Sequence, residues 1–531
     1  MTKRITLAIT NAVVWTGDPR KKWAQAAAVA GDRIAAVGTH EELKPLLDSA
    51  ERRIEARGRM VVPGFIDSHL HFLEGGLRLR QVALRDAASR EALVARLREY
   101  AARVPAGNWI TGGDWDHENW GGEPPHREWI DPVTPEHPVW INRLDGHMGL
   151  ANSLAFKLAG ISRATADVEG GTIVRDASGE PTGLLKDNAM ALVRKAIPAP
   201  RTEELESALE AAMRHVAACG ITSVHHMGGW RDIEIFRRAR QAGKLKTRIY
   251  AAIPLADWER LRDEVRAKGR GDEWLRIGGL KGFVDGSLGS RTAAFLAPYA
   301  DAPGDKGLLV NPPERLFEWI AGADKAGLHV MVHAIGDRAN RLLLDIFERV
   351  RTTGGRRDRR FRIEHAQHLA PADVPRFGKL GVIASVQPYH LIDDGRWAER
   401  AVGRRRVADC YPFRRLLDTG ATLAFGSDWF VAPPSPLEGI YAAVTRRTLD
   451  EAHPQGWVPE EKITVEEALA AYTHAGARAS FEEDLKGSIA AGKVADLVVL
   501  ERDLTRMPAQ EIRQVAVGLT VVAGEVVYEA G

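Results

Sequence analysis

Two histidines separated by one residue follow an apolar run in "VVPGFIDSHLHF", residues 61–72. Side chains at positions i and i+2 of a strand point to the same side, so His69 and His71 should direct their imidazoles into one small volume. Such a pair suits a divalent metal ion. The pair alone is weak evidence, because 17 histidines among 531 residues give one His-x-His pair by chance roughly half of the time.

Further residues with metal-binding or acid–base chemistry stand at the ends of other apolar segments. They are Lys281 in "RIGGLKGFVD", His333 in "LHVMVHAIG", His365 in "RFRIEHAQ" and Asp428 in "TLAFGSDW". If these segments are barrel strands, their carboxyl ends form one rim and the side chains converge. Imidazoles and carboxylates bind Zn²⁺ and similar ions, which lower the pKa of a bound water to about 7. Asp428 would then act as general base and acid.

Each of these residues also has a purely structural interpretation. His365 alone would be read as a hydrogen-bonded core histidine, and Asp428 as the cap of the following helix. Lys281 is harder to explain in this way, because a buried ammonium is costly unless it is neutralised, paired or modified. The order His-x-His, Lys, His, His, Asp, with each residue at a strand end, favours one shared site.

The elements that position these residues alternate between buried strands and amphipathic helices, as in a parallel α/β barrel or a doubly wound sheet. Nine strand candidates occur, one too many for an eight-stranded barrel. They are "MVVPGFIDSH", "PVWINR", "ITSVHH", "RIYAAIPL", "RIGGLKGFVD", "LHVMVHAIG", "RFRIEHAQ", "VIASVQP" and "TLAFGSDW". "PVWINR" is the only candidate between residues of about 73 and 205, and we interpret that segment as a loop-rich insertion after the first barrel strand. Helix signals are clear in two places: Gly220 should follow the C-cap of "TEELESALEAAMRHVAACG", and Thr464 and Glu467 form a capping box.

The two ends of the chain share a strand-and-turn composition. Residues 1–60 contain "ITLAITNAVVWTG" and "AAAVAGDRIAAVG", and residues 486–531 contain "KVADLVVLERD" and "VVAGEVVYEAG". Gly and Asp mark turns between these short strands. We expect both pieces to form one small composite β-domain, with the barrel and its insertion in residues 61–485.

Composition and charge narrow the class of protein. The net charge of +2 argues against a global field that recruits nucleic acid or an anionic membrane, and the basic runs near Arg360 and Arg405 are interpreted as solvated loops. Two cysteines and the lack of a long apolar segment predict a soluble, cytoplasmic protein without a disulfide framework. A small-molecule substrate is expected, and the oligomeric state is left open, a homo-oligomer included.

Several motifs together resemble the amidohydrolase superfamily, in particular the branch that includes N-substituted formamide deformylases. They are "GFIDSHLH", "LKGFVDGSLGSRTA", "VMVHAIGDRAN", "RIEHAQ", "AFGSDWFVAPPSPLEGI", "DGHMGLANSLA" and "GSIAAGKVADLVVL". The resemblance runs nearly end to end. It implies a distorted TIM (β/α)8 barrel, a flanking composite β-sandwich, and a site for one or two divalent metal ions, with zinc expected.

The resemblance also assigns roles to individual residues. His69, His71, His333 and His365 match metal ligands, and Asp428 matches the catalytic aspartate, which is also a ligand. Lys281 matches a strand-four lysine that many relatives carbamylate to bridge two metals, which would explain a buried lysine. The chain departs from the expected pattern at "SVHHM", where His226 stands in place of an aspartate.

Other polar residues in the rim loops are candidates for substrate binding, with the alternative that they tie loops together. They are Asp145, His147, Arg291, Gln387 and His390. Trp115, Trp120 and Trp429 are candidates for an apolar wall, although packing within the insertion is the alternative for the first two.

These residues predict a metal-dependent hydrolase of a non-peptide carbon–nitrogen bond, such as an amide or N-acyl group. Two alternatives stay open. One is a hydrolase of a cyclic amide, ester or lactone, or an isomerase, because a fold does not determine the substrate. The other is a binding protein that has lost turnover, against which the intact set of Asp428 and Lys281 argues.

Overall fold

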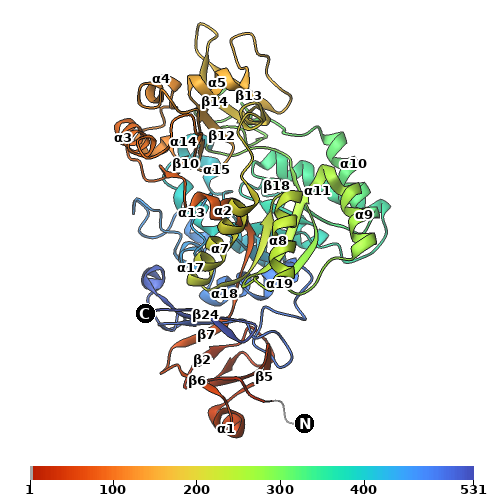
Figure 1. Cartoon of the computed structure of the whole chain (residues 1–531). Coiled ribbons are helices and arrows are strands. Elements are labelled where there is room, and N and C mark those ends of the chain that lie inside the picture. The colour runs from red at the N-terminus through yellow and green to blue at the C-terminus, as the bar shows by residue number, and fades with distance from the viewer. Residues whose placement is uncertain (1–3) are drawn as a thin grey trace.

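Three regions follow one another along the molecule in the computed structural model, which describes residues 4–531 (Figure 1). Strands from both ends of the chain lie at one end, next to the N- and C-termini. A parallel barrel lies in the middle, and the insertion forms the opposite end. The barrel is therefore enclosed between a terminal β-domain and an inserted domain.

The barrel is a sheet of eight strands, each paired in parallel with the next in sequence. Helices and loops connect the second to the eighth strand, and the insertion separates the first strand from the second. In chain order the strands are β8 (Phe65–Leu70), β15 (Ile221–Met227), β16 (Arg248–Pro254), β17 (Leu275–Phe283), β18 (His329–Ala334), β19 (Arg362–His365), β20 (Ile383–Val386) and β21 (Leu423–Phe425). These are the eight segments predicted for the barrel.

Hydrogen bonds between the carboxyl ends of the first and last strands bring the sheet close to closure. The backbone N–H of Asp428 donates to the carbonyl of His69 at 2.7 Å, and the backbone N–H of His71 donates to the carbonyl of Trp429 at 2.6 Å. These bonds lie immediately beyond β21. They fix the polar ends of the first and eighth strands against each other, and the predicted distorted TIM barrel is confirmed.

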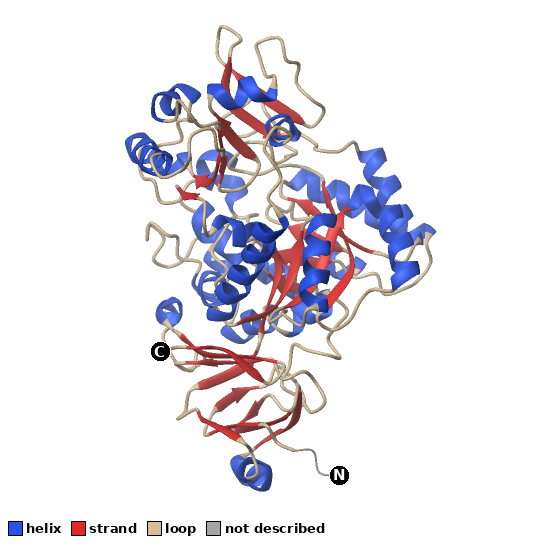
Figure 2. Ribbon diagram, viewed as in Figure 1, coloured by secondary structure: helices blue, strands red, loops and turns tan. Residues whose placement is uncertain are grey.

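Helices surround the barrel strands (Figure 2). The connections from β15 to β21 contain α8 (Trp230–Gln241), α9 (Trp258–Lys268), α10 (Pro313–Lys325), α11 (Asp337–Thr353), α12 (Val374–Leu380), α13 (Pro388–Asp394), α14 (Ala398–Val402), α15 (Arg404–Val407) and α16 (Phe413–Asp418). The chain then forms α17 (Pro436–Thr445), α18 (Val465–Ala471) and α19 (His474–Ala479). Apolar faces of these helices pack on the barrel in one large core. None of the helices within residues 4–531 is long and apolar enough to cross a membrane.

Both predicted helix boundaries are confirmed. The helix α7 (Thr202–Ala218) precedes the second barrel strand, and Gly220 follows its C-cap with a φ of 79°. Only glycine adopts this left-handed conformation without strain. Thr464 and Glu467 form the reciprocal capping box at the start of α18.

Strands from the two ends of the chain share one sheet in the terminal β-domain. That sheet has the order β24 (Glu525–Glu529), β23 (Val517–Val522), β22 (Leu497–Leu500), β7 (Met60–Pro63), β2 (Val13–Trp15) and β3 (Trp23–Ala24). A second sheet consists of β5 (Arg33–Gly38), β4 (Ala26–Ala30), β1 (Leu7–Thr10) and β6 (Arg52–Glu55), with α1 (His40–Asp48) packed on it. Apolar residues of both sheets form a common core, which is the composite sandwich.

Gly64 divides the run that the sequence presents as one strand. The residues before it, β7, belong to the terminal sheet, and those after it, β8, belong to the barrel. A Cβ atom at Gly64 would lie 2.2 Å from Oγ1 of Thr222, so no side chain fits at the crossing point. The terminal sheet thus extends to Pro63, beyond the expected limit of about residue 60.

The insertion differs from the loop-rich segment that we expected. It contains a six-stranded sheet in the order β13 (Gly171–Arg175), β14 (Pro181–Asp187), β12 (Met148–Ala151), β11 (Val139–Arg143), β10 (Ile110–Trp115) and β9 (Val82–Ala83). The helices α2 (Phe72–Arg78), α3 (Arg90–Ala101), α4 (Arg127–Ile130), α5 (Ser153–Ala159) and α6 (Ala191–Arg194) accompany it. Two apolar clusters form its own core. "PVWINR" becomes β11 and lies outside the barrel, as predicted.

Candidate metal centre and active site

The six residues predicted for the metal centre stand at one end of the barrel. His69 lies on β8 and His71 follows that strand as the N-cap of α2. Lys281, His333 and His365 lie on β17, β18 and β19, and Asp428 follows β21. All six line the same cavity, at the carboxyl ends of the parallel strands. This is the end at which the active sites of such barrels are built.

His69, His365 and Asp428 offer ligand atoms that all lie within 4.8 Å of one another. Oδ1 of Asp428 is 3.4 Å from Nε2 of His69 and 3.3 Å from Nε2 of His71. Nζ of Lys281 is 3.2 Å from the same Nε2 of His69. Five of the predicted side chains therefore converge on one small volume.

A buried carboxylate orients His69. Oε2 of Glu364 lies 2.5 Å from Nδ1 of His69, and both side chains are fully buried. Because a carboxylate only accepts, Nδ1 carries the proton and Nε2 presents its lone pair to the site. Arg362 in turn holds Glu364 through two bonds, at 2.8 Å and 3.0 Å.

His333 lies beside this group rather than within it. Its Nε2 donates to the carbonyl of Gly286 at 2.9 Å, which leaves Nδ1 as the nitrogen with a free lone pair. Its ring centroid is 4.5 Å from that of His365. His333, on β18, can therefore offer Nδ1 as a further ligand atom.

The donor set fits a divalent metal ion. Nδ1 of His365 and Oδ1 of Asp428 are buried and have no hydrogen-bond partner among the described residues. Burial and the neighbouring Lys281 ammonium together lower the pKa of His69 to about 4. Burial also holds the pKa of His365 well below its usual range. Neutral imidazoles and an ionised carboxylate are the protonation states that metal binding requires.

Asp428 is ionised despite its burial. Burial alone raises the pKa of its carboxyl, but the imidazoles of His69, His71 and His365 hold it well below the ordinary value. Both His365 and Asp428 have a positive φ, at 76° and 60°. Such backbone strain in residues other than glycine concentrates at functional sites.

Lys281 is an amine with a depressed pKa. Its side chain is buried and its Nζ lies 4.7 Å from the ring centroid of Phe283. Burial lowers its pKa to about 8, although Glu364 and Asp428 oppose the shift. A substantial fraction of neutral amine at physiological pH is the condition for reaction with CO2.

The cavity above the metal centre has a volume of about 800 Å³ and lies between the barrel rim and the insertion. Its apolar wall is formed by Leu73, Leu77, Trp140, Phe283 and Phe430. Ligand sites of this kind combine an apolar lining with a few convergent polar groups. The cavity is large enough for a drug-sized molecule.

Two of the five predicted substrate-binding residues line this cavity and are held firmly. Nδ1 of His147 is 2.6 Å from Oδ1 of Asp187, and its ring centroid is 5.0 Å from that of His333. Asp145 accepts from Arg143 at 2.6 Å and from the hydroxyls of two serines in the loop after β17. Asp145 therefore connects the insertion to the barrel, whereas His147 has a ring that faces the site.

The other three lie farther from the main cavity. Nη2 of Arg291 bonds Asp301 at 2.6 Å within the loop that follows β17, and Nε2 of Gln387 bonds the carbonyl of Ser385 at 3.2 Å within its own segment. His390 stacks parallel to His365, with centroids 6.3 Å apart, and its buried Nε2 has no hydrogen-bond partner within residues 4–531. It lines a small second cavity of about 50 Å³ that adjoins Asp428. Neither Arg291 nor Gln387 lines the large cavity.

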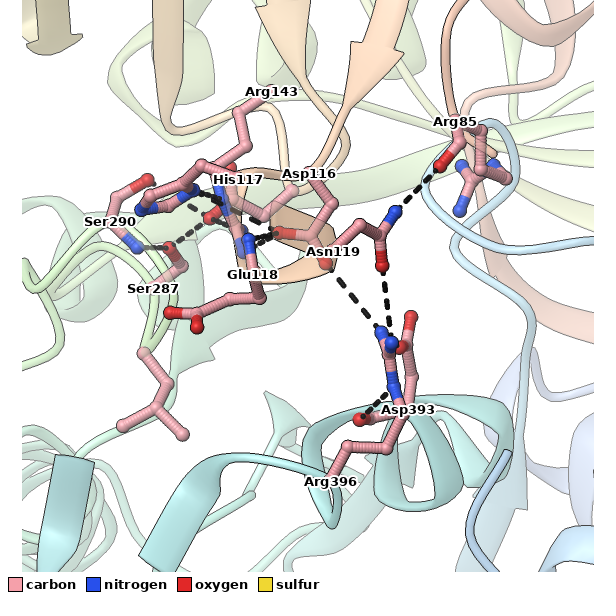
Figure 3. Close-up of polar contacts among 12 residues, drawn as sticks. Arg85, Asp116, His117, Glu118, Asn119, Arg143, Ser287, Ser290, Asp393 and Arg396 are labelled. Atoms are coloured by element: carbon pink, nitrogen blue, oxygen red, sulfur yellow. Dashed lines mark hydrogen bonds and ion pairs between the residues drawn. The ribbon is translucent and has the colours of Figure 1, made fainter. Parts of the chain in front are cut away.

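A polar junction fixes the insertion to the barrel loops (Figure 3). Nη2 of Arg143 bonds Asp116 at 2.6 Å, and both side chains are buried. Nδ2 of Asn119 donates to the carbonyl of Arg85, and Oδ1 of Asn119 accepts from Nη1 of Arg396, each at 3.1 Å. The segment "WDHEN" thus anchors the inserted sheet, a role that the sequence did not reveal.

None of the three candidate tryptophans lines the large cavity. Trp115 and Trp120 pack in the core of the insertion, which was the alternative given for them, and Trp429 stacks on His215 with centroids 5.1 Å apart. The aromatic side chains on the cavity wall are those of Trp140, Phe283 and Phe430. His226 accepts the N–H of Phe72 at 3.1 Å and contacts Asp232 at 3.1 Å, so both of its nitrogens are already engaged.

Comparisons with known proteins are consistent with this geometry. The model of the Amidohydrolase family matches residues 52–528. The protein LONG AFTER FAR-RED 3 of Arabidopsis thaliana is 41% identical over 98% of this chain and 91% of its own length. An N-substituted formamide deformylase of Arthrobacter pascens is 30% identical over 100% of this chain and 99% of its own. The crystal structure of an uncharacterized metal-dependent hydrolase from Pyrococcus horikoshii superposes with a TM-score of 0.76 at 29% identity, covering 95% of this chain and 99% of that one.

Proposed function

Because the chain belongs to the amidohydrolase family, we propose that it is a metal-dependent hydrolase of a non-peptide carbon–nitrogen bond, an amide or N-acyl group of the formamide type. The observation that carries this proposal is the cluster of His69, His365 and Asp428 at the floor of the large cavity. The relative from Arthrobacter pascens, named for deformylation of N-substituted formamides, supports the choice of bond.

The proposed metal ligands are the side chains that converge at the barrel rim. One or two divalent ions, with zinc as the expected metal, would be held by His69, His71, His333, His365, Asp428 and, after carbamylation, Lys281. When bound, such an ion supplies Lewis acidity and activates water at neutral pH. In the carbamylation of Lys281, its nitrogen forms a bond to the carbon of CO2 and releases one proton to solvent.

Asp428 is the residue proposed to move the proton. Its Oδ1 is unpartnered by any hydrogen bond among the described residues and stands 3.3 Å from His71 and 3.4 Å from His69. In this position it takes a proton from the attacking water and returns it to the departing nitrogen. The low pKa of its carboxyl favours the ionised form that begins the cycle.

His147 is proposed to bind the carbonyl oxygen of the substrate. Its Nδ1 is anchored on Asp187, and the pKa of His147 is raised because this carboxylate outweighs the effect of burial. A protonated ring fixed in this way can donate from Nε2 to a developing oxyanion. Phe283 and Phe430 exclude water from the same region of the cavity.

A substrate panel tests the proposed function. Zinc-loaded protein is assayed for release of amine from N-substituted formamides and acetamides, and for opening of a lactam, a lactone and a simple ester. Faster turnover of the acyclic amides than of the others is expected. Preference for the ester or the rings would replace the proposal with the cyclic-substrate or esterase alternative, and binding without turnover would indicate a binding protein.

A further inference from the structure

Two of the three arginines that line the large cavity, Arg78 and Arg194, are the last residues of short helices. Arg78 is the last residue of α2, and His71 is its N-cap. Seven helical residues at 1.5 Å each place Arg78 about 10 Å from His71 along the helix axis. Arg194 is the last residue of α6 and lines the same cavity.

The ring of Phe430 spans the distance between the metal centre and these arginines. Its centroid is 5.7 Å from the ring of His71 and 4.4 Å from Cζ of Arg78. Leu73 and Leu77 line the cavity from α2 itself. An apolar corridor therefore leads from the reacting centre to a cationic end.

Every carboxylate of the cavity wall has a basic side chain beside it. Each of them lies within 3.5 Å of a basic group: Glu74 pairs with Arg78, Asp145 with Arg143, Asp187 with His147, Asp232 with His226 and Asp428 with His71. Within residues 4–531, in contrast, the Arg194 side chain forms no ion pair and no hydrogen bond, although it is exposed on the cavity. Arg194 thus has no carboxylate partner on the wall, and Arg231 on the same wall bonds only the carbonyl of Pro200 among the described residues.

Arg78 adds unsatisfied donors beside the Arg194 guanidinium. Its Nη2 lies 3.0 Å from Glu74 and its Nη1 lies 3.6 Å from Asp114, and the buried Nε and Nη1 have no hydrogen-bond partner among the described residues. The surrounding cavity walls desolvate Arg194 and lower its pKa; Glu74 opposes this effect and the neighbouring Arg78 guanidinium adds to it. A substrate carboxylate bound by both guanidinium groups would accept from the open donors and relieve their repulsion.

We infer that the cavity selects substrates that carry a carboxylate, bound by Arg194 and Arg78, and separated from the scissile carbon–nitrogen bond by an apolar spacer. The inference rests on the proposed function, since it names the class of amide that the same site takes. The corridor along Phe430 is too long for an α-carboxylate next to the amide nitrogen. An aromatic ring or a short alkyl chain between amide and carboxylate fits it.

Matched substrates test this specificity. The value of kcat/KM is measured for 4-formamidobenzoate and for the uncharged 4-methylformanilide. In the native protein the carboxylate is expected to be preferred by about ten-fold to a hundred-fold, the range of one charge-assisted hydrogen-bonded contact. Arg194→Met should remove most of this ratio, Arg194→Lys should retain part of it, and Arg266→Met, an exposed arginine on α9 outside the cavity, should leave the ratio as in the native protein. Equal kcat/KM for both substrates in the native protein would overturn the inference.

A binding measurement separates this inference from the proposed function. Calorimetric titration of the zinc-loaded protein with 4-aminobenzoate and with 4-methylaniline requires no turnover. Tighter binding of the carboxylate, weakened about ten-fold or more by Arg194→Met, supports the anion site even if no amide is hydrolysed. Hydrolysis of neutral amides without any preference for the carboxylate in either assay would keep the proposed function and refute the anion site.

Discussion

Oε2 of Glu364 lies 2.5 Å from Nδ1 of His69, although 295 positions separate the two residues in the sequence. Glu364 is the residue immediately before His365 on β19, so one strand supplies both a proposed ligand and the group that orients another. Arg362, two residues earlier, forms a buried ion pair with the Glu364 carboxylate at 2.8 Å. The first and sixth barrel strands are thereby joined at the proposed metal site.

Replacement of Glu364 by glutamine should weaken metal binding. The amide still accepts a hydrogen bond but lacks the charge that raises the basicity of His69, and loss of such a partner typically lowers affinity by about 10–100-fold. Zinc affinity is measured by competition with a chromophoric chelator. Glu318→Gln, an exposed residue on α10, is the control and should bind zinc as the native protein does. Unchanged affinity in Glu364→Gln would refute the orienting role.

Loss of Arg362 should destabilise the barrel. Its guanidinium is fully buried and also donates to the carbonyl of Ser68, to Ser385 and to Nδ1 of His225. Arg362→Met leaves Glu364 as a buried charge without its cation, at a cost of about 3–5 kcal/mol. Urea unfolding of metal-free protein, followed by tryptophan fluorescence, measures the change.

A double variant identifies the source of that loss. When Glu364 is also replaced, in Arg362→Met/Glu364→Met, the uncompensated charge disappears and part of the stability should return. The loss of unfolding free energy in the double variant is compared with the sum of the losses in Arg362→Met and Glu364→Met. If the double variant loses this full sum, the ion pair is not the reason for the loss.

Lys281→Ala should abolish hydrolysis and reduce the zinc content. The amine lies 3.2 Å from Nε2 of His69, so a carboxylate attached to it would reach the metal ligands. Added acetate should restore part of the activity by occupying the same place, and ¹³C NMR with labelled bicarbonate should show a carbamate signal in the native protein only. A variant with native zinc content and rate would identify Lys281 as a structural residue.

Removal of the metal should lower the stability of the folded protein. Ligand that binds only the folded state adds about 2.7 kcal/mol at a hundred times its Kd. A chelator should therefore lower the melting temperature, and added zinc should restore it. His365→Ala, which removes one of the three clustered donors, should lose most of this response. A melting temperature that is the same with and without zinc would contradict a metal centre in the native protein.

The sequence predicts the barrel well because each of its strands is a buried apolar run with a distinct neighbour along the chain. Lys281, His333, His365 and Asp428 could be found for the same reason, since each marks a strand end. Glu364 and Arg362 were missed because their partners are distant in sequence. Charged residues at alternate positions are also typical of a strand with one exposed face, whereas both side chains are buried here.

Other features depend on packing that no local pattern records. The inserted sheet was missed because strands such as β10 and β13 are only partly buried, and β10 contains Gly112 and Gly113, both with positive φ. His226 was taken as an anomaly of the site, whereas its two nitrogens bind Phe72 and Asp232. Trp115 packs inside the insertion, where its indole N–H donates to the carbonyl of Ile141 at 3.1 Å.

In the proposed mechanism, metal ligands at the barrel rim and Asp428 together hydrolyse a carbon–nitrogen bond. The most direct test measures release of formate from an N-substituted formamide by native protein and by Asp428→Asn, with zinc content matched by elemental analysis. Loss of a general acid and base predicts a kcat about 10²–10⁴-fold lower in the variant. Equal rates at equal zinc content, or no formate from the fully loaded native protein, would contradict this mechanism.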